Sequence, residues 1–266
     1  MFSKPLFKAT LKQNYVVFII ILAVLMLYLP IIIQMFDPST QDTLDEMLKV
    51  LPQGLISAMG FSNVGSTLLG FVASYFYGFL ILLLPMIYVI IVANRSIASH
   101  VDKGSMAYLL STPNTRGKIA RTQAGFLLIS ITLLLGIVTI VGILVSENLF
   151  PNELDIKGFL LLNLNTLLLY FALTGIGFFA SCLFNDTKNS LALGAGLPVA
   201  FLVVQMLSNT GESVEFLKYF TLFTLLDSEK IINGEGYGIN FVILMILAII
   251  LYASGLYVFK NRDLPL

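Results

Sequence analysis

Few residues in this chain of 266 could carry out chemistry of their own. It has one histidine, His100, and one cysteine, Cys182. An HExxH pair, a GxSxG turn and a GxxxxGK[ST] phosphate loop are all absent, and Gly117-Lys118 lacks both the earlier glycine and the following hydroxyl of such a loop. The sequence therefore disfavours an enzyme and predicts no metal or cofactor on this chain. If ATP is used, another chain must bind it.

Apolar residues dominate the composition and indicate the fold class. They make up 58% of the chain, while charged residues make up 11%, against about a quarter in soluble domains. Six uncharged runs can each cross the bilayer as one helix, although the fifth is at the short limit. They cover residues 15–36, 67–93, 124–146, 159–184, 191–207 and 239–259. We expect an all-α polytopic membrane protein, a single transmembrane domain over residues 1–266.

The six runs contain no Asp, Glu, Lys, Arg or His. Ion-coupled transporters usually carry ionisable groups within their spans, so proton coupling has no obvious carrier here. The net charge is zero, which gives no indication of a nucleic acid partner.

Basic residues set the expected orientation, because cytoplasmic segments are enriched in Lys and Arg. With the amino terminus inside, only Lys49, Lys157, Lys218 and Lys230 lie outside, and Asp102, Asp186 and Asp263 are the only inner acids. We expect both termini in the cytoplasm.

Lys4, Lys8 and Lys12 recur every four residues and share one helical face. Residues 1–14 are therefore expected to form a cytoplasmic interfacial helix, with an unstructured basic tail as the alternative. On the outer side, residues 43–60 and 208–238 are more apolar than simple loops. The second of these, which is amphipathic, either re-enters the membrane or caps the bundle.

The inner segment, residues 94–123, carries a recognisable pattern: an acidic residue, a glycine, a leucine pair, a Ser/Thr-Pro step and basic residues. The matching positions are Asp102, Gly104, Leu109, Leu110, Ser111, Thr112, Pro113, Arg116 and Lys118. With the six spans and the final sequence RDLPL at 262–266, the chain resembles ABC-2 type permeases over nearly its whole length. Gln123 is one departure, because many relatives carry a lysine there.

The resemblance implies a type V exporter-like bundle in a bacterial cell membrane. It implies a permease subunit that pairs with a second permease, identical or related, and with two cytoplasmic ABC ATPase subunits that hold ATP and Mg²⁺. Charge-free spans suit a hydrophobic or amphipathic substrate, such as an antimicrobial or cytolytic peptide, a drug or a lipid-linked molecule. The alternative is a membrane receptor or immunity protein that binds peptides at 215–233 without transporting them.

Residues 94–123 are accordingly expected to form the ATPase-coupling loop. Met106, Leu109 and Leu110 lie at i, i+3 and i+4, which gives a short helix one apolar edge, and Pro113 ends it. Such an edge suits docking into a groove of the ATPase. The alternative is a connector whose leucine pair packs under its own bundle.

Small residues at spacings of four predict close helix packing within the spans. The positions are Gly70, Ser74, Gly78, Gly177 and Ser181. They fit packing within one subunit, a dimer interface or a substrate pathway. Pro30, Pro85 and Pro198 are candidate bend points.

Overall fold

The computed structural model describes residues 2–36, 52–59, 67–234 and 236–264. Regular structure in this part of the chain is helical throughout, and six helices are long and apolar enough to cross a membrane, which confirms the predicted fold class. They are α1 (Lys4–Gln34), α4–η1–α5 (Leu68–Ser96), α8 (Arg116–Leu149), α9 (Ile156–Leu183), α10–α11 (Thr187–Ser208) and α13 (Gly238–Asn261).

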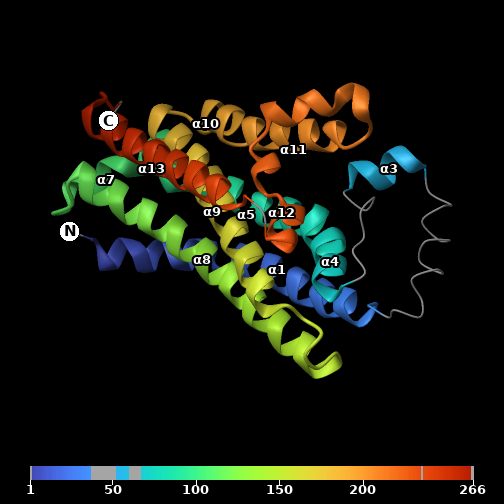
Figure 1. Cartoon of the computed structure of the whole chain (residues 1–266). Coiled ribbons are helices and arrows are strands. Elements are labelled where there is room, and N and C mark those ends of the chain that lie inside the picture. The colour runs from blue at the N-terminus through green and yellow to red at the C-terminus, as the bar shows by residue number, and fades with distance from the viewer. Residues whose placement is uncertain (1, 37–51, 60–66, 235, 265–266) are drawn as a thin grey trace.

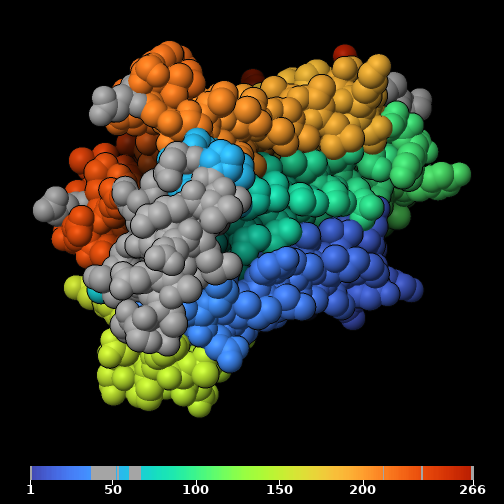
Figure 2. Space-filling model, turned by 90° about the vertical axis from the view of Figure 1, so that its right-hand side faces the viewer, coloured from blue at the N-terminus to red at the C-terminus, as the bar shows by residue number. Residues whose placement is uncertain are grey.

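Both termini lie at one end of the bundle, together with α7 (Ser105–Ser111), as Figure 1 shows. The helices α3 (Gln53–Ala58) and α4 (Leu68–Val72) lie toward the other end. Of residues 43–60, the other apolar segment predicted to lie outside, residues 43–51 and 60 are not among the described residues. In Figure 2, α1 (blue), α5 (Ile81–Ser96, green) and α10 (Thr187–Gly194, gold) lie side by side.

The basic amino-terminal segment is helical, but it has no boundary at residue 14. Helix α1 runs without interruption from Lys4 to Gln34, so the expected interfacial helix and the first span form one helix. The lysines are exposed, whereas Thr10 is buried against α8. Gln123 is fully buried there and its Nε2 donates to Thr10 Oγ1 at 3.1 Å. This buried bond gives a physical reason for an uncharged glutamine at this position.

Helix α9 is the centre of the bundle. In its most apolar stretch 78% of the residues are buried, against 22–56% in the other five spans. Its polar side chains explain this position, because a polar group inside the bilayer needs a partner that lipid cannot supply. Asn163, for example, accepts a hydrogen bond from the Tyr77 hydroxyl at 2.7 Å through its Oδ1.

Tyr170 of α9 compensates for a proline in the second span. Pro85 has no N–H, so the carbonyl of Ile81, four residues earlier, lacks its usual helical donor. The Tyr170 hydroxyl lies 2.7 Å from the carbonyl oxygens of Ile81 and of Leu82. This contact lets the helix continue past Pro85 while its freed carbonyl stays bonded inside the protein.

Ser181 of α9 supports a second irregularity, at the junction of α5 and α6 (Ala98–Asp102). The backbone N–H groups of Ile97 and Ala98 donate to Ser181 Oγ at 3.1 and 2.8 Å. One turn earlier, Gly177 packs so closely on α5 that a Cβ there would lie 2.6 Å from Ala93 Cβ. These two small residues therefore hold α9 against the second span.

The amphipathic segment 208–238, which is predicted to lie outside and is called the outer segment below, folds back onto the bundle. It comprises the 3₁₀ helices η2 (Glu212–Phe220) and η3 (Phe223–Leu225), followed by α12 (Ser228–Asn233). Phe223 and Ile231 are buried in the core, while Tyr219 and Phe220 are exposed. The carbonyl of Leu225 accepts hydrogen bonds from Asn165 of α9 at 2.9 Å and from Asn240 of α13 at 3.2 Å. The backbone of this segment is thus partly covered by protein, which fits both a re-entrant segment and a cap on the bundle.

Replacement of Gly177 by valine should destabilise the bundle, because α9 would have to move away from Ala93. We expect a cost of about 1–3 kcal/mol, measured as a lower melting temperature of the detergent-solubilised protein. Gly136→Val on α8 is the matched control, since a Cβ at Gly136 meets nothing within 4 Å. Equal melting temperatures for the two variants would contradict the packing described here.

Candidate functional site

Between the end of α5 and the start of α8, the predicted coupling loop 94–123 forms two short helices, α6 and α7, joined at Gly104. Gly104 has φ +69°, a left-handed conformation that favours glycine and turns the chain sharply between the helices. His100 bridges the turn, with Nδ1 3.0 Å from Ser105 Oγ. Burial, and then the charge of Lys103, lower the pKa of His100. His100 therefore links α6 to α7 across the turn.

Asp102 ties this segment to the fifth span. Its carboxylate accepts a 2.6 Å hydrogen bond from Thr187 Oγ1 at the first residue of α10. The preceding residue, Asp186, caps α10 by accepting from the backbone N–H of Asn189 at 2.7 Å, and this bond lowers the pKa of the Asp186 carboxyl. A movement of α6 would therefore act directly on α10 through the bond between Asp102 and Thr187.

The apolar edge of α7 faces its own bundle more than it faces outward. Met106 is fully buried, and Leu109 and Leu110 are half-buried against the core. Met106 therefore anchors α7 to the bundle and is not available to another subunit. The large side chain that α7 does expose is Tyr108, which is 78% exposed. The apolar periodicity of the sequence did not identify Tyr108, because this residue does not lie on the edge formed by Met106, Leu109 and Leu110.

Beyond α7, the Ser/Thr-Pro step is an exposed turn at Thr112 and Pro113. Arg116, at the start of α8, donates from Nη1 to the carbonyl oxygen of Arg262 at 2.7 Å. The Arg262 guanidinium lies over the Phe259 ring, and burial is the main cause of its lowered pKa, with Arg116 adding to it. Arg116 and Arg262 of the carboxyl-terminal sequence, which lie 146 residues apart in the chain, thus meet in space.

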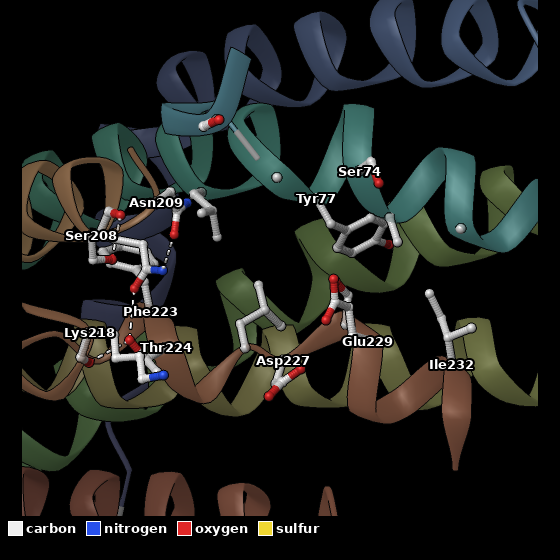
Figure 3. Close-up of a pocket in the computed structure, with 18 of the residues that line it drawn as sticks. Ser74, Tyr77, Ser208, Asn209, Lys218, Phe223, Thr224, Asp227, Glu229 and Ile232 are labelled. Atoms are coloured by element: carbon white, nitrogen blue, oxygen red, sulfur yellow. Dashed lines mark hydrogen bonds between the residues drawn. The ribbon is translucent and has the colours of Figure 1, made fainter. Parts of the chain in front are cut away.

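A cavity of about 980 Å³ lies toward the opposite end of the bundle from α7. One wall is the second span, including the π-helical stretch η1 (Ala73–Leu80), and the facing wall is α11 (Gly196–Ser208) with the outer segment. In Figure 3, Ser74 and Tyr77 lie across from Asp227, Glu229 and Ile232. Local π-helix often marks a functional site, because it re-aims side chains within a helix.

Gly70, Ser74 and Gly78, the first set of predicted small residues, all line this cavity. Gly177 and Ser181, the second set, instead pack α9 against α5. The two sets therefore differ in place: the first forms a cavity wall and the second a helix contact within the subunit.

The cavity is polar, which the charge-free spans did not predict. Three carboxylates and one ammonium group line it, all from the outer segment: Glu215, Asp227, Glu229 and Lys218. The hydrogen bond with Lys218 lowers the pKa of the Glu215 carboxyl. Gln205 of α11 accepts a 2.9 Å bond from Thr224, which joins that span to the outer segment. Within the described residues, no group of three or more His, Cys, Asp or Glu side chains is placed so that it could hold a metal ion.

These features define a polytopic membrane protein with a polar cavity toward one end and a short exposed helix, α7, at the other. Residues 7–264 match the model of the ABC-2 family transporter proteins, and the chain belongs to that family. It is therefore a permease subunit of an ABC transporter. No curated protein matches its sequence.

Proposed function

We propose that this chain is the permease of a bacterial ABC exporter. Two permeases, identical or related, pair with two cytoplasmic ATPase subunits, which bind ATP and Mg²⁺. The complex moves an amphipathic substrate out of the cell. The observation that carries this proposal is the placement of α7: a rigid helix anchored by Met106, exposing Tyr108, and connected through α5 and η1 to the cavity wall.

The proposed orientation places both termini and α6–α7 in the cytoplasm. The concentration of Lys and Arg at that end supports it, because basic segments are retained on the inner side. The cavity then lies toward the outer face of the membrane.

Cysteine labelling tests this orientation with two residues of equal exposure. Tyr108 is 78% and Tyr219 is 79% exposed, while the native Cys182 is fully buried. In intact cells whose outer surface is accessible, a membrane-impermeant maleimide should modify Tyr219→Cys and leave Tyr108→Cys unmodified until the membrane is permeabilised. The reverse order would overturn the orientation.

Docking of the ATPase on α7 is supported by the exposed ring of Tyr108, because aromatic side chains are common anchors at protein interfaces. Asp102 and Arg116 then hold α7 in place through Thr187 and the carbonyl of Arg262. ATP-driven closure of the two ATPase subunits would push on α7 and, through Asp102, on α10.

Tyr108→Asp should uncouple the complex. We expect loss of about 2 kcal/mol of binding, roughly a 30-fold weaker association with the ATPase subunit, with an unchanged melting temperature of the permease. Co-purification and substrate-stimulated ATP hydrolysis measure this effect. Tyr219→Asp is the matched control at the other end. Unchanged stimulation in Tyr108→Asp would exclude Tyr108 from the docking surface.

The charged and apolar residues that line the polar cavity favour one class of substrate over the others. Three carboxylates and one ammonium group line it, with Glu215 paired to Lys218 and Asp227 paired to Lys230 outside the lining. This lining supports a substrate that carries positive charge, and the apolar side chains of Leu82, Phe223 and Ile232 offer contact to an apolar face. A cationic amphipathic peptide combines both features, which favours it over a neutral drug or a purely apolar molecule. A peptide receptor could use the same cavity, but it would not release bound peptide in response to ATP.

Glu229→Gln should weaken transport of a cationic amphipathic peptide about two- to fivefold, the range of one partly exposed charge contact. The effect should appear in the peptide concentration for half-maximal ATP-dependent export from cells or vesicles. Glu153→Gln, exposed and outside the cavity lining, is the control. If Glu229→Gln weakens export of a neutral analogue as much as export of the cationic peptide, the carboxylate does not select for charge.

A further inference from the structure

The fifth span is broken near its middle. Helix α10 ends at Gly194 and α11 begins at Gly196, with Ala195 as a turn residue between them. Pro198, in the first turn of α11, has no N–H, so the carbonyl of Gly194, four residues earlier, lacks its usual helical donor. Sharp bends in helices are almost always found at proline or at pairs of small residues. This stretch of the span is therefore a candidate hinge.

The two halves of the span pack differently. Helix α10 packs on α9 and α5, and Gly194 lies so close to α9 that a Cβ there would be 3.3 Å from Gly177 Cα. A Cβ at Gly196 would meet nothing within 4 Å. Helix α11 packs mainly on η2, with smaller contacts to α3 and η3, and three of its 13 residues are buried. The first half is thus fixed to the bundle, while the second half is held mainly by the outer segment.

Two hydrogen bonds join α11 to the outer segment. Thr221 Oγ1 donates to the carbonyl of Phe201 at 2.9 Å, and Thr224 Oγ1 donates to Gln205 Oε1 at 2.9 Å. The next residue, Leu225, is instead held at its carbonyl by α9 and α13, and α12 packs on α9 and α4. A movement of α11 would therefore carry η2 with it, while the chain from Leu225 onward stays with the bundle.

Helices α11 and η2 together form one wall of the polar cavity. Gln205 of α11 and Glu215 and Lys218 of η2 line it, opposite the wall formed by η1. In Figure 1, α11 and the outer segment (both orange) lie together on one side of the bundle. Since α11 has 13 residues, it is about 20 Å long, and a change in bend of about 20° would move its far end by about 7 Å. That movement is large enough to change the width of the cavity.

We propose that α11 and η2 form a hinged flap that opens and closes the polar cavity. The hinge lies at residues 194–198, and Leu225 is the pivot at the other end of the flap. Helix α10 stays packed on α9 while the flap moves Gln205, Glu215 and Lys218 toward or away from η1. The movement is a property of this chain and requires neither the ATPase nor a substrate.

Double electron–electron resonance on the full-length protein in lipid nanodiscs tests this proposal. Spin labels are attached to Leu207→Cys near the far end of α11 and to Leu160→Cys at the start of α9, positions that are 50% and 48% exposed. The native Cys182 is buried and should stay unlabelled. Labels at Leu191→Cys on α10 and at Leu160→Cys form the control pair. The distances of the first pair should spread over about 7 Å more than those of the control pair.

Gly196→Ala is the test variant, because its Cβ has space and alanine favours a continuous helix. It should narrow the spread of the Leu207–Leu160 distances to that of the control pair. Pro198→Ala, which returns an N–H to the carbonyl of Gly194, should narrow the spread independently. Gly136→Ala is the matched control, since its Cβ also has space but α8 is unbroken there, and it should leave the spread as in the wild type.

A wild-type spread as narrow as that of the control pair would overturn the proposal, as would an unchanged spread in both Gly196→Ala and Pro198→Ala. A distance signal from protein labelled at Leu207→Cys alone would also overturn it, because α11 would then lie against a second copy of the chain. None of these outcomes bears on export, which the measurements of ATP hydrolysis and transport test separately.

Discussion

The hydrogen bonds that α9 makes to the second span are the interaction on which this structure depends. A membrane helix can bend or change its winding only where other protein groups satisfy its freed backbone. Tyr170 supplies a donor to the carbonyl left open by Pro85, and Ser181 supplies an acceptor at the break between α5 and α6. With these bonds in place, the second span can be irregular at Pro85 and at its junction with α6 while staying buried.

Both candidate functional regions depend on that irregular span. At one end its π-helical stretch presents Ser74 and Tyr77 to the polar cavity. At the other end, the break at Ile97 lets the chain leave the bundle and form α6 and α7. One continuous stretch of chain therefore runs from the cavity wall to the exposed Tyr108. Asp102 adds a lateral link to α10, which continues toward α11 and the facing wall of the cavity.

The sequence predicts the six spans well, because length and absence of charge are local properties that the bilayer itself enforces. The turn at Gly104 and the bond from Asp102 to Thr187 lie at two positions of the pattern that marked residues 94–123, but the pattern itself predicted neither contact. It does not show that Met106 is buried, since periodicity identifies an apolar edge without saying what covers it. The sequence does not predict the polar cavity either. Its carboxylates come from the outer segment, and only the folding of η2, η3 and α12 back onto the second span brings them to Ser74. The separate amino-terminal helix failed as a prediction because nothing interrupts α1 between Lys4 and Gln34.

The central claim is that the bundle has no energy source of its own and receives work through α7. Reconstitution in liposomes tests it most directly, with the permease alone and with its ATPase subunits, under imposed proton and sodium gradients. The account predicts concentrative movement of an amphipathic peptide only when the ATPase and ATP are both present. Gradient-driven accumulation by the permease alone would contradict it.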